Sequence, residues 1–417
     1  MFKKVTVQQL RLGMYIHALG GAWIHHPFWR STFMLDDPED LQQLRSSTVP
    51  EVWIDLTKGL DVLDDSQTPD HPIESTPPAI TAPELLGTAP TPLSEEIAQA
   101  RALCAEARDA VMDMFGEARM GHAINMARNT VLVQEITNSV LRNPDALISL
   151  ARLKTADDYT YMHSVAVSAL MVTLARQLGH DEAQVHRAAM AGLLHDIGKA
   201  RSNQAILNKP GALTEEEFAH MKRHPVAGYE LLKHTINDEG ILNACLHHHE
   251  RIDGRGYPDR LQGDAVTELA RMNAICDVYD AITSNRPYKK GWSPAVALQR
   301  MAQWCNGHLD NHLFTAFVKA LGVYPIGSLV RLSNGELAVV YAPCQNNLLA
   351  PKVVRFYDTT RSQFLTPPQP TDLCCVANLR ILQREEPEHW SFPDLDAIWQ
   401  AAAALETGPS EAVCAVC

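Results

Sequence analysis

The chain has 417 residues, a formal net charge of −13 and 20% charged residues. This length is enough for two or three domains with hydrophobic cores. The acidic balance argues against binding along DNA or RNA, which needs a basic surface, although a few cations in a pocket can still bind a small anion. We therefore expect no nucleic acid polymer among its partners.

No stretch of the sequence has the length and apolar character of a membrane span, so we expect no membrane contact. The first residues, MFKKVTVQQL, lack the apolar core of a signal peptide. The nine cysteines follow no disulfide framework, which favours a reducing, cytoplasmic location. We interpret the CxxC of Cys414 and Cys417 as part of a frayed terminus.

Residues 1–63 alternate short apolar runs with turns. GMYIHAL and EVWIDL are typical of strands, and DPEDLQQLRSS is typical of a helix that opens at Asp37. This pattern predicts a small α+β domain with a regulatory or interaction role. The next segment, 64–93, is rich in proline and lacks sustained periodicity, which predicts a flexible linker.

The composition changes at Ser94, where a serine and two glutamates open SEEIAQARALCAEARDAVMDMFGEARM in the manner of a helix N-terminus. Helical patterns continue from there and predict an all-α domain over 94–322. Strand patterns return in GSLVRLSNGELAVVYAP, where SNG predicts a hairpin. We predict a β-rich appendage over 323–383 and a weakly ordered tail over 384–417, so that the fold as a whole is mainly α.

The most informative residues are polar side chains on otherwise apolar helices. AMAGLLHDIGKA ends an apolar helix at His195 and Asp196, with Lys199 one turn later. Isolated charges in such settings are costly unless they are paired or bound to a metal. Four other segments carry the same kind of residue: His163 in YTYMHSVAVSALMVTLA, His220 and His224 in EEEFAHMKRHPVAGYELL, His247, His248 and His249 in ILNACLHHHERIDGRGYP, and Asp277 and Asp280 in ELARMNAICDVYDAITSNRPYKK.

Imidazole and carboxylate donors suit hard or borderline divalent metal ions, and no cysteine joins the cluster as a zinc thiolate would require. The donors are too many for one ion, which favours two. A carboxylate such as Asp196 has two oxygens and can bridge two ions, which can then hold a hydroxide and stabilise an in-line displacement at phosphorus. The nearby cations that would hold phosphate oxygens are Lys199, Arg286, Lys289 and Lys290.

These segments resemble the HD-GYP subfamily of HD-domain phosphohydrolases, which are cyclic di-GMP phosphodiesterases of bacterial signalling. HDIGK at 195–199 is similar to the HD motif, and AILNKPGALTEEEFAHMKRHPVAGYELL, HHERIDGRGYP and DVYDAITSNRPYKK look like the motifs of the subfamily. The resemblance covers roughly 150–340 and implies an HD-type helical bundle. Residues 1–63 resemble, more weakly, an N-terminal domain of unknown function that precedes some HD-GYP domains.

The resemblance implies ligands for two divalent ions, which in this family are iron or manganese. The first ion would be surrounded by His163, His195, Asp196 and Asp277. Asp196 would bridge to the second ion, whose other ligands would be His224, His248 and His249. Some family members add a third ion through a glutamate four residues before the first histidine. Tyr159 occupies that position here, so the resemblance implies a dinuclear site.

The resemblance also implies how the substrate is held and cleaved. Lys199 would contact the scissile phosphate and act with Asp196 as a catalytic residue. Arg286 and Lys289 would bind phosphates, and Tyr257, in a loop near the site, would be a further substrate-binding residue. The implied reaction is hydrolysis of cyclic di-GMP to pGpG through a bridging hydroxide, with further cleavage to GMP left open.

Two other functions stay open. The protein could act mainly through partners such as diguanylate cyclases, or it could hydrolyse another nucleotide, such as a dNTP or ppGpp. A homodimer is a further option, and the sequence does not identify a ligand of the N-terminal domain.

Several polar residues near the motifs are not expected to bind metal. Asp280 is predicted to cap or pair within the structure, and His247 to face away from the ions. Glu250 and Arg251 are predicted to pair with each other or to orient ligands. His220, which matches no ligand of the motif in which it lies, and His308 and His312, which lie outside the motifs, are likewise not expected to bind metal.

Overall fold

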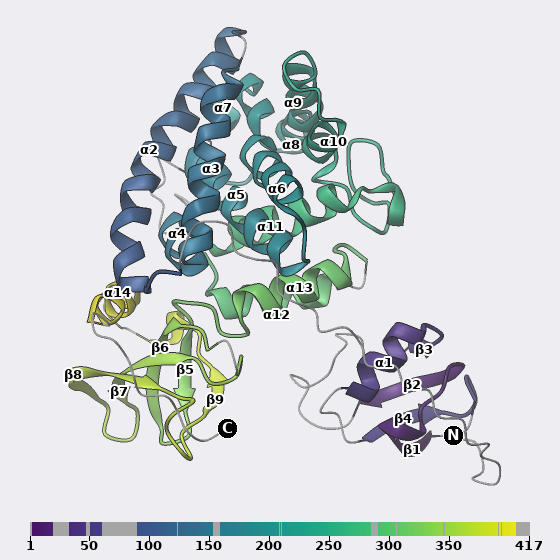
Figure 1. The fold of residues 1–417 in the computed structure, drawn as a ribbon, viewed down its shortest axis with the longest axis vertical. Coiled ribbons are helices and arrows are strands. Elements are labelled where there is room, and N and C mark those ends of the chain that lie inside the picture. The colour runs from purple at the N-terminus through teal and green to yellow at the C-terminus, as the bar shows by residue number, and fades with distance from the viewer. Residues whose placement is uncertain are drawn as a thin grey trace. The chain divides into compact units, whose positions relative to one another are not determined.

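The chain forms two compact units, Met1–Pro83 and Glu84–Cys417, each with its own core (Figure 1). The structure, a computed structural model, describes residues 2–19, 33–46, 51–60, 90–122, 124–152, 159–207, 209, 211–284, 291–305, 307–344, 347–390, 392 and 394–405. No helix within these ranges is long and apolar enough to cross a lipid bilayer.

The first unit is an antiparallel sheet with one α-helix. Its elements are β1 (Phe2–Thr6), β2 (Met14–Leu19), β3 (Phe33–Leu35), α1 (Pro38–Ser46) and β4 (Glu51–Asp55). The strand order is β1-β4-β2-β3, so the last strand pairs between the first two. The predicted α+β domain is confirmed here, including the two strands and the helix that begins just after Asp37.

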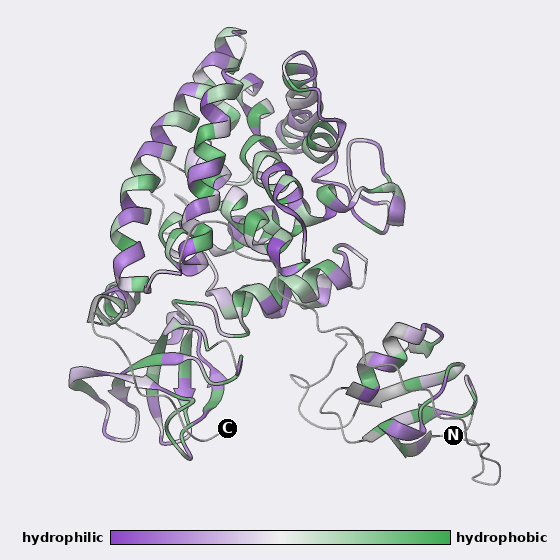
Figure 2. Cartoon of the chain, in the orientation of Figure 1, coloured by the Kyte–Doolittle hydropathy of each residue, from purple (hydrophilic) through white to green (hydrophobic). Residues whose placement is uncertain are grey.

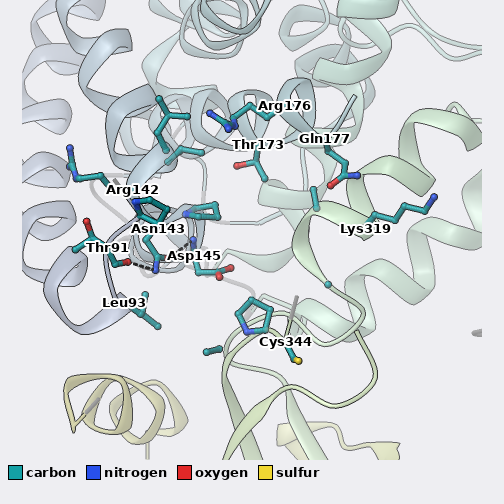
Figure 3. Close-up of a pocket in the computed structure, with 18 of the residues that line it drawn as sticks. Thr91, Leu93, Arg142, Asn143, Asp145, Thr173, Arg176, Gln177, Lys319 and Cys344 are labelled. Atoms are coloured by element: carbon teal, nitrogen blue, oxygen red, sulfur yellow. Dashed lines mark hydrogen bonds between the residues drawn. The ribbon is translucent and has the colours of Figure 1, made fainter. Parts of the chain in front are cut away.

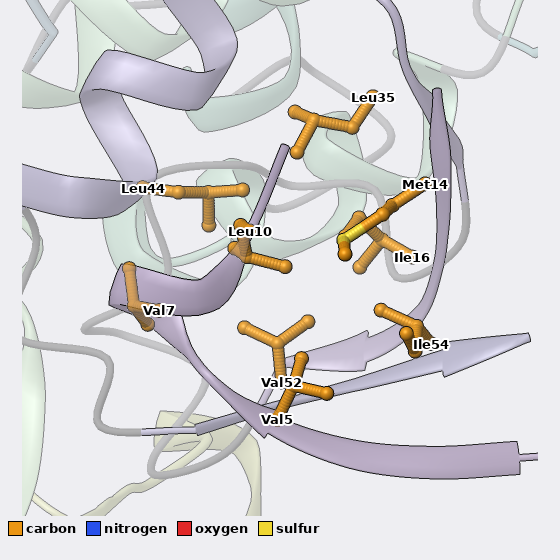
Figure 4. Packing of buried hydrophobic residues seen from close by; sticks show 9 residues of the cluster. All are labelled: Val5, Val7, Leu10, Met14, Ile16, Leu35, Leu44, Val52 and Ile54. Atoms are coloured by element: carbon orange, nitrogen blue, oxygen red, sulfur yellow. The ribbon is translucent and has the colours of Figure 1, made fainter. Parts of the chain in front are cut away.

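Alternation along the strands builds the core of this unit (Figure 4). Val52 and Ile54 are fully buried, whereas Trp53 between them is 40% exposed, as expected when successive side chains point to opposite faces. One face of the sheet therefore packs against α1 and the other does not. The side chains of this core are Val5, Val7, Leu10, Met14, Ile16, Leu35, Leu44, Val52 and Ile54.

The second unit begins with the helical domain. Its α-helices, in the described ranges, are α2 (Leu93–Met120), α3 (Met126–Arg142), α4 (Pro144–Arg152), α5 (Tyr159–Gln177), α6 (Glu182–Leu194), α7 (Gln204–Leu207), α8 (Glu215–Met221), α9 (His224–Leu232), α10 (Glu239–His247), α11 (Glu268–Thr283), α12 (Pro294–Trp304) and α13 (Asn311–Leu321). The predicted mainly α fold is confirmed.

Helix α5 is the centre of this domain. All residues from Met162 to Ala175 are buried, because α5 packs against α2, α4, α6, α11 and α13. Helix α2, in contrast, has one face towards solvent, and hydrophilic and hydrophobic residues alternate along it in Figure 2. A helix that is apolar all round is expected at a core. A histidine near the start of α5 is therefore deeply buried.

The start of the helical domain lies earlier than the sequence predicts. Helix α2 begins at Leu93 with Pro92 as its N-cap, so Ser94 is not the cap. Thr91 donates its main-chain N–H to the carbonyl of Arg142, at 3.0 Å. The end of the predicted linker 64–93 thus already belongs to the helical domain, and its residues 64–89 lie outside the described ranges.

The C-terminal part of the second unit is an antiparallel sheet with the strand order β8-β7-β6-β5-β9. Its strands are β5 (Leu329–Leu332), β6 (Glu336–Ala342), β7 (Lys352–Asp358), β8 (Gln363–Asp372) and β9 (Ile381–Arg384). The predicted SNG hairpin joins β5 to β6, and Gly335 adopts a φ of +84°, which favours glycine. The predicted β-rich appendage is present.

The prediction of a weakly ordered tail over 384–417 is wrong for its first half. Helix α14 (Leu395–Leu405) packs against α2, β6 and β7 and buries Trp399 completely. Asp396 accepts a hydrogen bond from the Trp399 indole at 2.9 Å and pairs with Arg152 of α4 at 3.0 Å. These contacts tie the tail to the helical domain. Cys414 and Cys417 lie outside the described residues.

A cavity of about 660 Å³ lies where the helical domain meets this sheet (Figure 3). Its lining includes Arg176 and Gln177 at the end of α5, Lys319 of α13 and Cys344 after β6. Arg176 and Lys319 are exposed to solvent. This cavity is therefore an open junction between two parts of the unit.

Candidate metal centre

The structure brings together all seven residues that the sequence predicts as metal ligands. They come from five segments: His163 from α5, His195 and Asp196 from the turn after α6, His224 from the start of α9, His248 and His249 from the turn after α10, and Asp277 from α11. Each of these segments lies within or at the end of an apolar helix. The packing of the helices around α5 is thus what makes the polar residues converge.

The seven side chains form two groups, in each of which the donor atoms lie within 4.8 Å of one another. The first donor group consists of His163, His195 and Asp277. The second donor group consists of Asp196, His224, His248 and His249. Two groups of imidazole and carboxylate donors match the requirement for two metal ions better than for one.

Asp196 connects the two groups through its two carboxylate oxygens. Its Oδ2 lies 3.3 Å from Nε2 of His195 and 3.5 Å from Nε2 of His163. Its Oδ1 lies 3.2 Å from Nε2 of His224 and 3.9 Å from Nε2 of His248. Ligands at about 2.1 Å from one ion are about 3 Å apart when they are adjacent in its coordination sphere. Each oxygen of Asp196 is therefore placed to serve one group.

Main-chain carbonyls orient three of the imidazoles. In each case Nδ1 lies 2.8 Å from the carbonyl oxygen three residues earlier: His195 with Gly192, His224 with Met221, and His248 with Cys245. These carbonyls belong to the last turns of α6, α8 and α10, where helix carbonyls lack an intrahelical partner. Because Nδ1 donates to a carbonyl, Nε2 carries the lone pair and faces the centre, as in metal-binding histidines.

A carboxylate orients the fourth imidazole. Nδ1 of His163 lies 2.6 Å from Oδ2 of Asp280, and its Nε2 lies 3.0 Å from Oδ1 of Asp277. Oδ1 of Asp280 accepts a hydrogen bond from Ser284 at 3.2 Å. Asp280 lies in neither donor group and pairs within the structure, as predicted. On the other side, the ring of Tyr159 stacks on His163 at 5.8 Å.

The donors fit divalent metal ions. Nε2 of His195 and Oδ1 of Asp196 are buried and have no hydrogen-bond partner among the described residues, so both keep free lone pairs directed into the centre. Nε2 of His224 and Nε2 of His248, both acceptors, lie only 3.2 Å apart, which is unfavourable unless a cation lies between or beside them. Burying such atoms without a partner is costly. A bound cation removes this cost.

The protonation states of three of the donors also suit metal binding. Burial opposes ionisation of Asp196, but the ammonium of Lys199 beside it holds the pKa of Asp196 well below its ordinary value. Burial lowers the pKa of His248 and of His249. The carboxylate is thus ionised and these two imidazoles are neutral at pH 7, which are the forms that bind metals.

Glycine allows the second group to approach the first. A Cβ on Gly198 would lie 1.9 Å from the carbonyl oxygen of His224 and 2.5 Å from the nitrogen of Gly228. The turn after α6 therefore contacts the backbone of α9 directly. This contact brings His224 within reach of Asp196.

The run His247, His248 and His249 divides into two parts. Helix α10 ends at His247, and the next two residues form a turn, which lets the rings of His248 and His249 lie 4.1 Å apart in the same group. His247 belongs to neither group and bonds instead to Asp259, at 2.9 Å. The regular helix therefore ends before His248 and His249, and the turn allows both imidazoles to face the second donor group.

The loop that follows closes one side of the centre. Tyr257 stacks on His249 with 4.8 Å between the ring centroids. A Cβ on Gly256 would lie 2.4 Å from Cα of Glu250, so the loop folds back against the end of the histidine run. The main-chain N–H of Asp259 donates to Glu250 at 2.7 Å. The loop is thus held by Glu250, which does not contact the donor atoms.

Other predicted residues have clear positions. Lys199 is 20% exposed and its ammonium pairs with Oδ2 of Asp196. Arg251 pairs with Asp253 at 2.6 Å and not with Glu250, which was the first of the two alternatives predicted for these residues. Arg286 and Lys289 lie outside the described residues. His220, His308 and His312 belong to neither donor group.

Sequence reasoning missed part of the surroundings of the centre. A cavity of about 450 Å³ opens beside His248, His249 and Asp277. Its lining includes residues that were not assigned a role from the sequence: Phe218, Lys222, Arg255, Trp304 and His308. Only His308 had attracted attention, as a member of an i,i+4 histidine pair. A tryptophan at the end of a helix gives no signal in the sequence that it lines a site.

The chain matches two known families. A family described as a domain of unknown function, DUF3391, matches residues 2–128, and a family described as an HD domain matches residues 135–313. The second range contains both donor groups and the cavity beside them.

Several relatives are similar to this chain. A cyclic di-GMP phosphodiesterase of Pseudomonas aeruginosa is 50% identical over 410 residues, which cover 97% of each chain. A cyclic di-GMP phosphodiesterase response regulator of Xanthomonas campestris is 45% identical over 161 residues, 38% of this chain and 42% of its own. A 3′3′-cGAMP-specific phosphodiesterase of Vibrio cholerae is 36% identical over 163 residues, 39% of this chain and 38% of its own.

A solved structure of an HDG"Y"P protein from Bdellovibrio bacteriovorus is 17% identical, with a TM-score of 0.44, and covers 76% of this chain and 98% of its own. The identity to the Pseudomonas enzyme, in contrast, is high and runs along nearly the whole of both chains. In this chain an HD domain follows a DUF3391 domain. The chain therefore belongs to the HD-GYP family of metal-dependent HD-domain phosphohydrolases.

Proposed function

We propose that the protein hydrolyses cyclic di-GMP to pGpG through a centre of two divalent metal ions. The observation that carries the proposal is the position of Asp196, whose two carboxylate oxygens each face a different group of donors. The first ion would be held by His163, His195 and Asp277 with one oxygen of Asp196. The second would be held by the other oxygen with His224, His248 and His249.

The substrate class follows from the relatives. The Pseudomonas protein that shares half of its residues with this chain is named a cyclic di-GMP phosphodiesterase, and so is the Xanthomonas response regulator. The Vibrio relative is named for 3′3′-cGAMP, another cyclic dinucleotide. A cyclic dinucleotide is thus the substrate class, and cyclic di-GMP is the proposed member.

Paired divalent ions would supply a reactive water at neutral pH and would polarise phosphoryl oxygens. The side chains of the protein would bind the substrate and transfer the proton. Asp196 would remain ionised and would contribute one carboxylate oxygen to each donor group. Lys199, whose ammonium pairs with Asp196 and is partly exposed, would donate a hydrogen bond to a phosphoryl oxygen and transfer a proton to the leaving oxygen. Arg286 and Lys289 would bind the remaining phosphate oxygens.

The resemblance to the HD-GYP family favours iron or manganese, and we propose one of these as the physiological metal because a mixed set of imidazoles and carboxylates can hold either. The test is anaerobic purification of the full-length protein, metal analysis, and incubation of the same sample with cyclic di-GMP followed by chromatography. We expect about two ions per chain and accumulation of pGpG. Asp196→Ala should abolish turnover and keep the helicity measured by circular dichroism.

Turnover that persists in Asp196→Ala would contradict the bridging role. Absence of turnover with iron and with manganese would contradict the proposed activity. A panel that includes 3′3′-cGAMP, dNTPs and ppGpp distinguishes the substrates. If the metal-loaded protein cleaves none of them but binds a diguanylate cyclase, the alternative of a regulatory protein would be favoured.

A further inference from the structure

The cavity beside the second donor group has a wall that the proposed chemistry does not use. The cavity measures about 450 Å³, and His248, His249 and Asp277 form one part of its lining. Trp304 and His308 form another part of the lining, and these two residues are the wall. An aromatic surface beside the proposed metal centre could contact a part of the substrate other than its phosphate. This inference rests on the proposed function only for the identity of that substrate.

Trp304 and His308 present two neighbouring rings to the cavity. Their centroids are 6.2 Å apart, with 32° between the ring planes, and both side chains are half-buried. Trp304 is the last residue of α12, and its carbonyl accepts the main-chain N–H of His308 at 2.8 Å. The indole N–H of Trp304 has no acceptor within the described part of the chain. Both side chains therefore contribute to the lining of the cavity, and the indole N–H is left without an acceptor among the residues that the structure describes.

The wall is fixed to the loop that closes the centre. The main-chain N–H of Ile252 donates to His308 at 3.3 Å, and that of Asp253 donates to Gly307 at 2.9 Å. Asp253 is held in turn by two hydrogen bonds from Arg251, at 3.0 and 2.6 Å. A wall anchored by main-chain bonds is ordered before a ligand arrives, which lowers the entropy cost of binding.

The lining of the cavity includes a second aromatic surface, at Tyr257. Tyr257 stacks on His249, and the ammonium of Lys222 lies 5.5 Å from the centre of the Tyr257 ring. One cavity thus has metal donors and two aromatic surfaces in its lining. A cyclic dinucleotide could use both kinds of contact, because it joins phosphates and two purine bases in one molecule.

We propose that Trp304 and His308 form a stacking surface for one purine base of the substrate. Stacking on aromatic side chains is a general way to bind bases, since every base has a π-face. Burial, and then the nearby Arg251, lower the pKa of His308, so its imidazole is neutral at pH 7 and stacks without losing hydration of a charge. Arg255 is exposed at the same cavity, and a guanidinium can donate to O6 and N7 of guanine.

A neighbouring residue offers a matched control. The ring of Trp292 lies 6.3 Å from that of Trp304, but Trp292 is not part of the lining of this cavity. If Trp304 only completes an aromatic cluster, Trp292→Leu and Trp304→Leu should act alike. If Trp304 binds a base, only Trp304→Leu should weaken base recognition.

The first test measures binding, independently of hydrolysis. Isothermal titration of the manganese-loaded full-length protein compares GMP with ribose 5-phosphate, which has the same phosphate and sugar but no base. We expect GMP to bind at least tenfold more tightly in the native chain and in Trp292→Leu, and this ratio to fall to about threefold or less in Trp304→Leu. Equal affinities of the two ligands in the native chain would overturn the proposal, whatever the enzyme hydrolyses.

The second test separates binding from chemistry. With cyclic di-GMP as substrate, Trp304→Leu should raise KM about tenfold with kcat within about threefold, and Trp304→Phe should restore KM because a flat ring is kept. A KM equal to that of Trp292→Leu would overturn the proposal. Lack of turnover in the native chain together with base-dependent binding of GMP would contradict the proposed substrate and support the base-stacking surface.

Discussion

The two donor groups differ in what determines their positions. His163 and Asp277 of the first group lie within α5 and α11, two helices whose places follow from burial of their apolar faces. The histidines of the second group lie at the ends of shorter helices, and His224 depends on the backbone contact at Gly198. Core packing therefore positions one group, and close backbone contacts position the other. The two should respond differently to substitution.

The largest effect is expected when one imidazole is removed from either group. His163→Ala and His224→Ala should each reduce the metal content from about two ions to about one per chain. Each should lower kcat on the order of 10³-fold or more, because two-metal chemistry needs both ions. Metal analysis and turnover of cyclic di-GMP check this. His220→Ala, which removes a histidine outside both groups, should leave both values unchanged.

Equal loss of both ions in either variant would show that the groups form one cooperative site. That result would contradict the proposed difference in how the two donor groups are positioned.

The next effect tests the backbone contact of the second group. Gly198→Ala places a methyl group 1.9 Å from the His224 carbonyl, so α9 must move away. We expect loss of the second ion and a decrease in stability of about 1–3 kcal/mol, the usual cost of forcing extra volume into a packed contact. Metal analysis and thermal unfolding measure the two effects.

Gly116→Ala is the matched control, because a Cβ there meets no atom within 4 Å and Gly116 lies within α2. It should stabilise the helix by roughly 0.5–1 kcal/mol. If Gly198→Ala retains two ions, the close contact does not position His224.

A smaller effect is expected from the carboxylate that orients the first group. Asp280→Asn should keep the fold and lower metal affinity or activity by about 10–100-fold, as is usual for residues that orient a ligand. The reason is the 2.6 Å contact with Nδ1 of His163. Competition with a chelator measures the affinity. Asp113→Asn, at an exposed pair with Arg128, is the control and should behave as the native chain.

The smallest effect is expected within the histidine run. His247→Ala removes the contact with Asp259 but no donor of either group, so both ions should remain and kcat should change less than about threefold. Metal analysis decides this. Loss of one ion would mean that His247, and not one of its two neighbours, is a ligand.

The sequence predicts the composition of the centre but not how it is held. The seven donors are identifiable because they interrupt apolar helices and match the family motifs. The carbonyl partners of His195, His224 and His248 could not be predicted, since they depend on where α6, α8 and α10 end. The contact at Gly198 joins segments that are distant in sequence, and a local pattern does not indicate such a pair.

The fold shows the same division. Strands and long helices follow their periodicity, whereas α14 was missed because its position near the end of the sequence outweighed the helical composition of LDAIWQAAAAL. Alanine and leucine have high helix propensity, so this helix was predictable in principle. What could not be predicted is the complete burial of Trp399, which depends on contacts with α2 and the C-terminal sheet.

The carbonyl partners of the histidines have a consequence for the choice of metal. Each imidazole–carbonyl pair lies within four consecutive residues, so a segment such as Met221 to His224 can shift as a rigid piece without turning its ring. Small shifts between segments would change the size of the coordination sphere and leave every Nε2 directed inward. A centre built in this way tolerates ions of different radius, and availability in the cell, more than geometry, would decide which metal is bound.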